Sequence, residues 1–360
     1  DPEMSRGLGD VYKRQIVKAT YFNPKIVVID ETTTALSQEG REELYKHMER
    51  IRKSGNTVIF ISHDLPEIIE KSDTITILRD GVYIDTVKSK DVNENDLKKL
   101  MVGREVTGDY YRSDYGEKIS DEVVLSAKHV TVPGLIEDVS FDLHKGEILG
   151  FGGLSESGMH EIGKAIFGAS YDREGTVELA DGTQINDIPT AIKHSIAYTS
   201  KDRDNESVVL NQSIGDNICL PSLDELSGPA HLISDKKKKD FANKFAKQMS
   251  VKMVDVNQFV SNLSGGNKQK VVLARWIGKD SDIVVLDSPT RGIDIKVKQD
   301  IYQLMNQMRK NGKSIIMISE ELMELIGMCD RIMIMKDGKI SGELERDQNL
   351  DENGLITMMV

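Results

Sequence analysis

The sequence has little cysteine and no long apolar stretch. Only Cys219 and Cys329 occur among 360 residues, which is too few for a disulfide framework and favours a reducing cytosol. The longest apolar runs, such as residues 26–29 and 315–318, have the length of a strand. A membrane-spanning helix needs roughly 18–20 apolar residues, so none is expected. No apolar segment typical of a signal peptide is visible near residue 1.

An excess of basic residues is also missing. The formal net charge is −12, which argues against a protein that binds nucleic acid through bulk charge. Hydrophobic residues make up 39% of the chain and charged residues 29%, a balance typical of an ordered soluble protein. The cysteines have no metal-ligand spacing. Because 360 residues exceed one ordinary hydrophobic core, we expect two domains.

What the sequence does contain is an internal repeat. Residues 26–81 resemble residues 283–338 without a gap, at a constant offset of 257 residues, so that Asp30 corresponds to Asp287. Each copy has an apolar run that ends in Asp, an amphipathic helix, a Gly turn, a second apolar run, a short acidic helix and a third strand. This alternation predicts two related domains, each with a parallel sheet whose strands are buried on both faces.

The two copies differ in what precedes them, and this difference sets the expected domain boundaries. More than 150 residues of the second domain precede its repeat, but only 25 residues precede the first repeat. We expect residues 1–15 to be foreign or unstructured and residues 16–103 to be the C-terminal part of a first domain. The polar, turn-rich residues 104–121 are expected to form a linker, and residues 122–360 a second domain.

A candidate phosphate-binding loop follows a predicted strand at residues 147–151. Gly153 and Gly158 match the two glycines of G-x-x-x-x-G-K-[ST], and Ser157 lies inside the loop. Met159 replaces the lysine of that motif, and His160 replaces its hydroxyl residue. Backbone N–H groups at the start of the following helix suit phosphate oxygens. The fragment alone fits a nucleotide loop and an ordinary strand–turn–helix joint equally well.

A second candidate site begins at the helix that follows Leu263. Ser264 is a suitable N-cap residue, and Gly265 and Gly266 allow an anion to approach the free N–H groups of the first turn. A lone Ser-Gly-Gly would favour a capped surface helix. The apolar run IVVLD, which ends at Asp287 about twenty residues later, makes that simpler interpretation weaker.

At these residues the sequence resembles a known family. LSGGNKQK followed by VVLDSPTRGID resembles the signature motif, Walker B strand and D-loop of an ATP-binding-cassette (ABC) ATPase, and IVVIDETTTALS with VIFISHD resembles a further cassette. The combination is similar to the sugar-import ATPases of the ribose, galactose/methyl galactoside and xylose type, over about residues 16–360. The resemblance implies an α/β fold of tandem P-loop NTPase cassettes, each with a parallel RecA-like sheet, an antiparallel β subdomain and a helical subdomain, the first cassette being incomplete.

The resemblance also implies roles for single residues. Asp30 would hold Mg²⁺, Glu31 would orient the attacking water and His63 would contact the γ-phosphate of ATP. Residues 264–266 would contact the γ-phosphate of ATP bound to the opposite cassette. One hydrolytic site would therefore combine residues from both halves of the chain. Such a set suits phosphoryl transfer, which depends on positioning and on charge neutralisation.

The second composite site resembles an inactive one. Asp287 is retained, but Ser288 stands where the catalytic carboxylate belongs, and Glu320 stands where the switch histidine belongs. A carboxylate that faces a γ-phosphate is electrostatically unfavourable. We expect this half to bind nucleotide weakly or only structurally. Lys201 belongs to a string, residues 201–203, that retains part of the acidic-basic motif of the family.

The implied partners are ABC permease subunits in the membrane and, indirectly, an extracytoplasmic sugar-binding protein. ATP and Mg²⁺ are the implied cofactors, and the expected location is the cytoplasmic face of the membrane. A twin-cassette protein that acts on ribosomes is one alternative, which the net charge of −12 opposes. A non-catalytic nucleotide-binding fragment is another, because no phosphate-loop or signature motif precedes Asp30, and the chain alone is expected to be inactive. No residue identifies the sugar.

Overall fold

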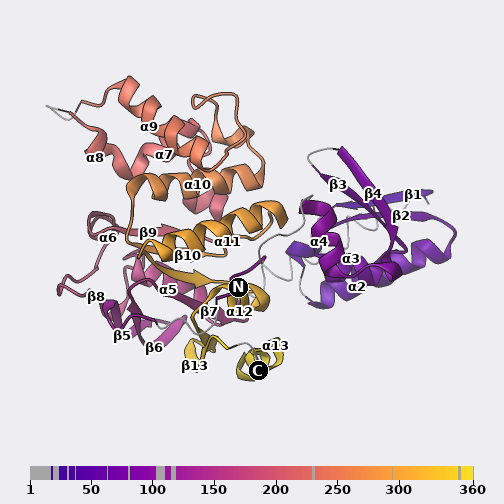
Figure 1. The fold of residues 1–360 in the computed structure, drawn as a ribbon. Coiled ribbons are helices and arrows are strands. Elements are labelled where there is room, and N and C mark those ends of the chain that lie inside the picture. Colours follow the sequence, from indigo (N-terminus) through magenta and orange to yellow (C-terminus); the bar gives the residue numbers. More distant parts are fainter. Residues whose placement is uncertain are drawn as a thin grey trace. The chain divides into compact units, whose positions relative to one another are not determined.

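The chain folds as two compact units in the computed structural model (Figure 1). The structure describes residues 18, 24–30, 32–36, 38–62, 64–79, 82–102, 110–114, 119–228, 232–293, 295–347 and 350–359. Described residues up to 102 form the first domain. Those from 110 onward form the second domain, apart from residues 295 and 296. The segment 1–15, for which foreign sequence was expected, lies outside the described residues.

The first domain is an alternation of strands and helices. Its elements are β1 (Ile26–Asp30), η1 (Thr32–Ala35), α2 (Gln38–Lys53), β2 (Thr57–Ile61), α3 (Leu65–Lys71), β3 (Thr74–Arg79), β4 (Val82–Lys88), η2 (Ser89–Asp91) and α4 (Glu94–Val102). Strand β1 pairs with β2 in parallel, and β3 pairs with β4 antiparallel. These pairs are separate two-stranded sheets among the described residues.

The second domain adds an antiparallel sheet and a helical part. Its strands are β5 (Val123–Val132), β6 (Ile136–His144), β7 (Ile148–Gly153), β8 (Glu174–Leu179), β9 (Ile196–Thr199), β10 (Ile283–Asp287), β11 (Ser314–Ile318), β12 (Arg331–Lys336) and β13 (Lys339–Glu345). Its helices are α5 (Met159–Ile166), α6 (Ile188–Lys193), η3 (Arg203–Ser207), α7 (Ile214–Cys219), η4 (Leu220–Ser222), α8 (Leu223–Leu226), α9 (Asp235–Gln248), η6 (Val260–Asn262), α10 (Gly265–Lys279), α11 (Ile295–Lys310), α12 (Leu322–Met328) and α13 (Glu352–Met359).

The sequence repeat is also a structural repeat. Elements β1, α2, β2, α3, β3 and β4 correspond to β10, α11, β11, α12, β12 and β13, and both bounds of every element keep the offset of 257 residues. The parallel register is the same, since Ile26 pairs with Thr57 and Ile283 with Ser314. The antiparallel pairs share an irregularity, after Ile77 and after Ile334. The predicted strand–helix alternation is confirmed in both copies.

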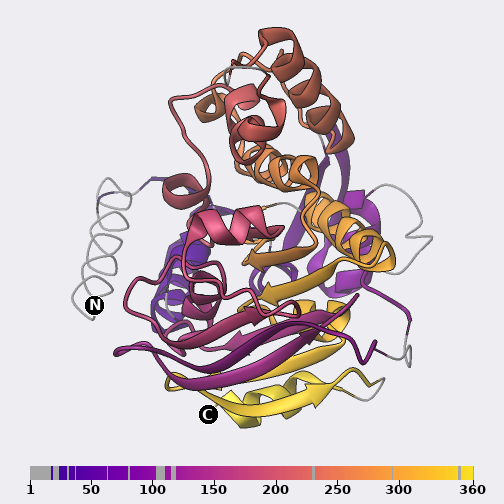
Figure 2. The same ribbon diagram turned by 90° about the vertical axis from the view of Figure 1, so that its left-hand side faces the viewer.

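A six-stranded sheet organises the second domain. Its strand order is β13-β12-β7-β11-β10-β9, with parallel pairing except at the β13 edge. Helix α5 packs between this sheet and the antiparallel sheet β6-β5-β8, which Figure 2 shows in profile. Helices α12 and α13 pack on the opposite face. A Cβ atom at Gly150 of β7 would lie 2.7 Å from Cys329 Sγ, so glycine allows α12 its close approach.

The helical part of the domain consists of α7, α9 and α10, which pack against one another (Figures 1 and 2). Helix α7 begins with a capping box formed by Ser213 and Asp216, which satisfies free N–H groups of its first turn. Helix α10 also packs on the core of the domain, where the side chain of Trp276 is buried. The second domain therefore contains the helical subdomain that the family resemblance implies.

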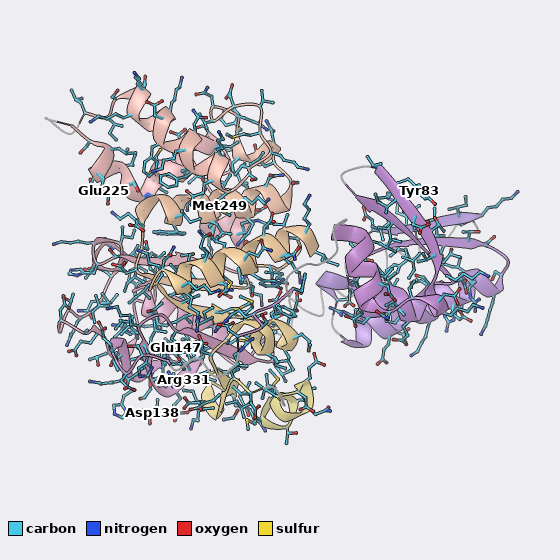
Figure 3. All side chains as sticks on the ribbon, viewed as in Figure 1. Tyr83, Asp138, Glu147, Glu225, Met249 and Arg331 are labelled. Carbon is cyan, nitrogen blue, oxygen red and sulfur yellow. The ribbon has the colours of Figure 1, made fainter. Side chains whose placement is uncertain are left out.

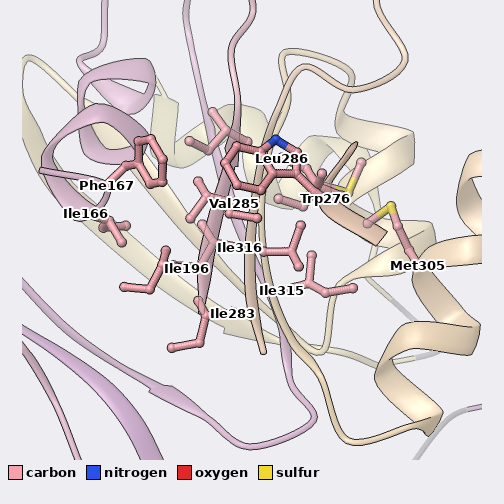
Figure 4. Close-up of a cluster of buried hydrophobic side chains, with 14 of the residues drawn as sticks. Ile166, Phe167, Ile196, Trp276, Ile283, Val285, Leu286, Met305, Ile315 and Ile316 are labelled. Atoms are coloured by element: carbon pink, nitrogen blue, oxygen red, sulfur yellow. The ribbon is translucent and has the colours of Figure 1, made fainter. Parts of the chain in front are cut away.

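The core of the second domain explains its continuous apolar runs. Strands β10 and β11 are buried at every position, because α5 and α10–α12 surround the sheet. Figure 4 shows Val285, Ile315 and Ile316 from these strands together with Trp276 and Met305. When both faces of a parallel sheet are covered, side chains that point to either face are buried, so every residue of such a strand is apolar. The continuous apolar runs predicted this burial.

An ion pair connects the two sheets at the lower edge of the domain in Figure 3. Arg331, at the start of β12, donates from Nε to Oε1 of the fully buried Glu147 at 2.6 Å (Figure 3). Its Nη2 donates to the carbonyl oxygen of Asp142 in β6 at 2.7 Å. Because the buried carboxylate is paired with a guanidinium, the desolvation cost of Glu147 is offset.

The first domain contradicts the expectation of full burial. Its strand β1 alternates between exposed and buried residues, and Ile26 and Val28 are each 58% exposed. Only the opposite face packs, where Val27 and Ile29 contact Leu44 of α2. The reason is topological, since no described residue of this domain forms a counterpart of β7 or α5.

The described part of the expected linker is held on the second domain. Tyr111 and Arg112, within the segment 104–121, pack on the second domain. The Arg112 side chain is 1% exposed; it pairs with Asp330 at 2.7 Å and donates to the carbonyl oxygen of Met328 at 2.8 Å. Tyr111 lies so close to Gly327 that a Cβ atom there would be 2.3 Å from its ring. Polar composition does not distinguish a solvated linker from a segment held by a buried ion pair, which is why the sequence indicated a linker.

Candidate nucleotide-binding site

The candidate phosphate loop connects β7 to α5, as predicted, and its two glycines are required by the backbone. Gly158 has a φ of +88°, and a Cβ atom there would lie 2.5 Å from the Leu135 carbonyl oxygen. A Cβ atom at Gly153 would lie 2.3 Å from Ser157 Oγ. The Ser157 hydroxyl is buried and has no hydrogen-bond partner within the described part of the chain.

The loop offers a phosphate its backbone but little side-chain charge. The first N–H groups of an α-helix lack acceptors within the helix, and α5 begins directly after the loop. Met159, at the position of the motif lysine, is fully buried in the core. The residues therefore fit a phosphate group held by N–H donors, without the lysine that strengthens such sites.

His160 contacts the aspartate at the end of β10. Its Nδ1 lies 2.7 Å from Asp287 Oδ1, and both side chains are buried. The Ser288 hydroxyl donates to the same carboxylate at 3.2 Å, and the Tyr198 hydroxyl donates to its other oxygen at 3.4 Å. Burial lowers the pKa of His160, but the hydrogen bonds to Asp287 and Glu320 outweigh burial and leave the pKa raised.

Glu320 and Lys201 extend this contact into a network at the mouth of the loop. Lys201 Nζ lies 2.6 Å from Glu320 Oε1 and 3.0 Å from His160 Nε2. Ser155, a loop residue, donates to the same oxygen of Glu320 at 3.0 Å. Hydrogen bonds from His160, Lys201 and Ser155 lower the pKa of Glu320 well below its ordinary value, although burial opposes them, so Glu320 is a carboxylate.

Lys201 and Ser155 are the residues that the sequence reasoning missed at this site. The available signal was Glu320 itself, because an acid in place of the switch histidine needs a cation nearby when it is half-buried. Lys201 comes from the string at residues 201–203, which was not assigned to the loop. Spacing along the chain does not reveal this contact, since 119 residues separate Lys201 from Glu320.

The donor set of the second domain does not fit Mg²⁺. This ion prefers six oxygen ligands in nearly octahedral geometry. Here a ring nitrogen of His160 replaces a hydroxyl and already occupies the carboxylate of Asp287. No group of three or more side chains that could hold a metal ion occurs among the described residues.

The Ser-Gly-Gly segment lies where it was expected, at the start of α10. Ser264 has the extended backbone of an N-cap residue, but its hydroxyl makes no capping bond and accepts instead from Asn267 Nδ2 at 3.0 Å. The predicted capping bond is therefore absent at this residue. Arg203 lies against Gly265, where a Cβ atom would be 3.1 Å from its Nη2. Residues 201–203 thus contact both the loop network and the Ser-Gly-Gly segment.

In the first domain the structure describes one of the three predicted catalytic residues. Asp30 ends β1 with an exposed side chain, while Glu31 and His63 lie outside the described residues. The residues beside them form a hub around the buried carboxylate of Glu67. Thr33 donates to it at 3.1 Å, Ser62 donates at 2.7 Å, and the Tyr45 hydroxyl donates as well.

The same hub recurs in the second domain, residue for residue. Glu324 is fully buried and accepts from Thr290, Tyr302 and Ser319, each at the offset of 257 residues from its counterpart. Each hub joins the loop after one strand to the end of the next strand. The hydrogen bonds that position the ends of these strands are therefore the same in both copies. The residues at the candidate catalytic positions differ, since Glu31 corresponds to Ser288 and His63 to Glu320.

Comparison with protein families and curated proteins gives consistent matches. A family model described as "ABC transporter" matches residues 136–291. The chain is 37% identical over 346 residues to "Ribose import ATP-binding protein RbsA" of Clostridium tetani, which covers 96% of this chain and 68% of that protein. It is 42% identical over 357 residues to "Xylose import ATP-binding protein XylG" of Thermoanaerobacter pseudethanolicus, covering 96% of this chain and 70% of that protein.

Solved structures support the fold alone. The dimeric bacterial ABC transporter cassette MJ0796 matches with a TM-score of 0.55 and 22% identity, and covers 62% of this chain and 99% of its own. A nucleotide-free ABC transporter cassette matches with a TM-score of 0.55 and 17% identity. The chain thus shares the α/β fold of ABC cassettes.

Proposed function

Since the chain belongs to the family of sugar-import ATP-binding proteins of ABC transporters, we propose that it binds and hydrolyses ATP to drive monosaccharide import. The observation that carries this proposal is the extent of the match. Identity of 37–42% continues over 94–96% of the chain in the relatives from Clostridium tetani, Lactococcus lactis and Thermoanaerobacter pseudethanolicus, and so includes both copies of the repeat.

The repeat supports two cassettes in one chain, the first of them incomplete. Six elements, their register and the carboxylate hub recur at one offset. In this proposal, Asp30, Glu31 and His63 serve hydrolysis in the first cassette, and residues 264–266 contact the γ-phosphate of bound ATP. Asp30 holds Mg²⁺, whose charge neutralises phosphate oxygens. Glu31 polarises the attacking water, and His63 hydrogen-bonds the γ-phosphate.

The second site is proposed to be non-hydrolytic. Ser288 has no carboxylate that could polarise water, and Glu320 has no N–H group for a phosphate. The chain would then turn over ATP at one site only. Permease subunits are the proposed partners, with a sugar-binding protein acting through them, at the cytoplasmic face of the membrane and without nucleic acid. Among the described residues, no helix has both the length and the apolar character needed to cross a bilayer.

The test is purification of the tagged protein, with the first half of its first cassette restored, from detergent-solubilised membranes of its own cells, followed by assays of phosphate release; the chain alone is expected to release none. We expect integral membrane proteins to co-purify and sugar to stimulate release. Glu31→Gln should lower turnover by about a hundredfold or more, since it removes the residue that polarises water. Glu43→Gln, an exposed change of the same type on α2, is the control. Unchanged turnover in Glu31→Gln, or recovery with ribosomes, would contradict the proposal.

A further inference from the structure

Three positions that serve the terminal phosphate and its metal in an ABC cassette converge in the second domain. They are the residue after the loop lysine, the aspartate of the Walker B strand and the switch residue, here His160, Asp287 and Glu320. Asp287 lies 2.7 Å from His160, and Glu320 lies 3.4 Å from it. The positions are thus brought together as in a working site, but by side chains that bind one another.

The position of the terminal phosphate is taken by a carboxylate. Glu320 receives a hydrogen bond from Ser155 of the loop and an ion pair from Lys201. A γ-phosphate at a nucleotide loop also needs a loop donor and a cation. Glu320 therefore has the partners that a terminal phosphate would have, and it is a permanent part of the chain.

The position of the metal is closed as well. The Asp287 carboxylate, 1% exposed, is bound on one oxygen by His160 and Ser288 and on the other by Tyr198. An incoming Mg²⁺ would have to displace buried, satisfied hydrogen bonds before it gained an oxygen ligand.

The inner part of the loop keeps donors that the network does not use. They are the N–H groups at the start of α5 and the buried, unpartnered hydroxyl of Ser157. We infer that the second domain takes a nucleoside diphosphate in preference to the triphosphate, without a divalent cation, because Glu320 and His160 occupy the places of the terminal phosphate and the metal. This inference rests on the proposed nucleotide binding of the chain and specifies its second site.

The charges of the network also favour a diphosphate over a triphosphate. Lys201 and His160, whose pKa is raised, face the carboxylates of Glu320 and Asp287, so the network has no net positive charge with which to attract a third phosphate. A γ-phosphate would also lie against the Glu320 carboxylate, and repulsion between such close charges is strong when the groups are partly buried. A diphosphate ends before that point and leaves the network intact.

The experiment is photolabelling of the full chain on ice with azido-ADP or azido-ATP, radiolabelled on the α-phosphate, in the presence of Mg²⁺ or of EDTA. Peptide mapping assigns the label to the first or the second domain. In the second domain, azido-ADP should half-saturate at about a tenfold lower concentration than azido-ATP. Replacing Mg²⁺ by EDTA should change the azido-ADP value by no more than about twofold.

Glu320→Gln tests the cause of this preference. It keeps the hydrogen bond from Ser155 and removes the charge, so azido-ATP should approach azido-ADP to within about twofold. Glu137→Gln is the matched control, because Glu137 forms an exposed ion pair with Lys339 and does not contact the network. It should keep the tenfold preference. Emission of Trp276, the single tryptophan of the chain, verifies that each variant is folded.

Three results would overturn the inference. The first is stronger labelling of the second domain by azido-ATP with Mg²⁺ than by azido-ADP. The second is an unchanged preference in Glu320→Gln. The third is the absence of both labels from the second domain. Failure of the proposed function is a separate outcome, since it would appear as turnover that survives Glu31→Gln, whichever nucleotide labels the second domain.

Discussion

Strands β10 and β11 are buried on both faces, whereas β1 and β2, with the same lengths and register, each leave one face exposed. Val285 is fully buried and its counterpart Val28 is 58% exposed; Ile316 is fully buried and Ile59 is 47% exposed. The difference comes from neighbours. Strand β7 lies between β11 and β12 in the second domain, and α5 covers that sheet. An apolar run is thus compatible with burial of a strand on both faces. Whether the strand is buried depends on the elements that surround it.

The carboxylate hubs show the opposite behaviour. Glu67 and Glu324 accept hydrogen bonds from the same three residue types in both domains, although the described residues of the first domain form two-stranded sheets and those of the second a six-stranded sheet. Every donor of the hub comes from the repeated segment itself. Local elements are therefore sufficient for the hub, whereas burial of the strands depends on residues outside the repeat.

The largest effect is expected from the anchor of Arg112 on the second domain. Arg112→Ala leaves Asp330 buried beside a missing partner and should destabilise the second domain by about 3–5 kcal/mol. Urea unfolding followed by Trp276 emission measures this loss. Lys145→Ala, which removes an exposed ion pair with Glu122, should cost at most about 1 kcal/mol. Equal costs would show that the anchor is not buried in solution.

The paired strands give the next effect. Ile316→Ala removes a fully buried side chain and should cost about 2–5 kcal/mol, whereas Ile59→Ala should cost less than about 1 kcal/mol. Urea unfolding measures the first variant, and hydrogen–deuterium exchange of the β2 peptide measures the second. If Ile59→Ala is as costly as Ile316→Ala, then the exposed face of β2 is covered in solution and the comparison fails.

A smaller effect is expected at the hubs. Tyr302→Phe keeps the ring contacts and removes one donor from buried Glu324, which should cost about 1–2 kcal/mol. Tyr45→Phe should cost less, because Tyr45 is only partly buried. Urea unfolding measures Tyr302→Phe, and hydrogen–deuterium exchange of the first domain measures Tyr45→Phe. A larger loss in the first domain would contradict the view that the hubs differ only in burial.

The smallest effect concerns acid. Burial raises the pKa of Asp114, but hydrogen bonds and charge from Arg112 outweigh burial and lower the pKa to about 2 from an ordinary value of 3.8. The stability contributed by ionised Asp114 is present above pH 3.8 and is lost as the pH falls through about 2. Asp114→Asn should therefore be less stable than the natural protein at neutral pH and equal to it below pH 2. Acid titration of Trp276 emission measures the difference, and a gap that persists below pH 2 would refute this assignment.

Much of the frame could be predicted from sequence because it depends on local pattern. The apolar runs and the glycines with positive φ, Gly55, Gly158 and Gly312, correspond to requirements of the local backbone. The exposed face of β1 was not predictable in this way, because burial depends on elements far along the chain. Lys201 was missed for the same reason, since its partner Glu320 is close in space and distant in sequence.

The hub around Glu324 has a consequence for how such sites change over evolutionary time. It fixes Ser319 and Thr290 through their hydroxyls, and neither the residue after Ser319 nor the residue after Asp287 takes part in it. A substitution at position 288 or 320 can therefore remove the chemistry of one copy without cost to its shape. The duplicated chain can lose activity in one half and still keep that half as a folded surface.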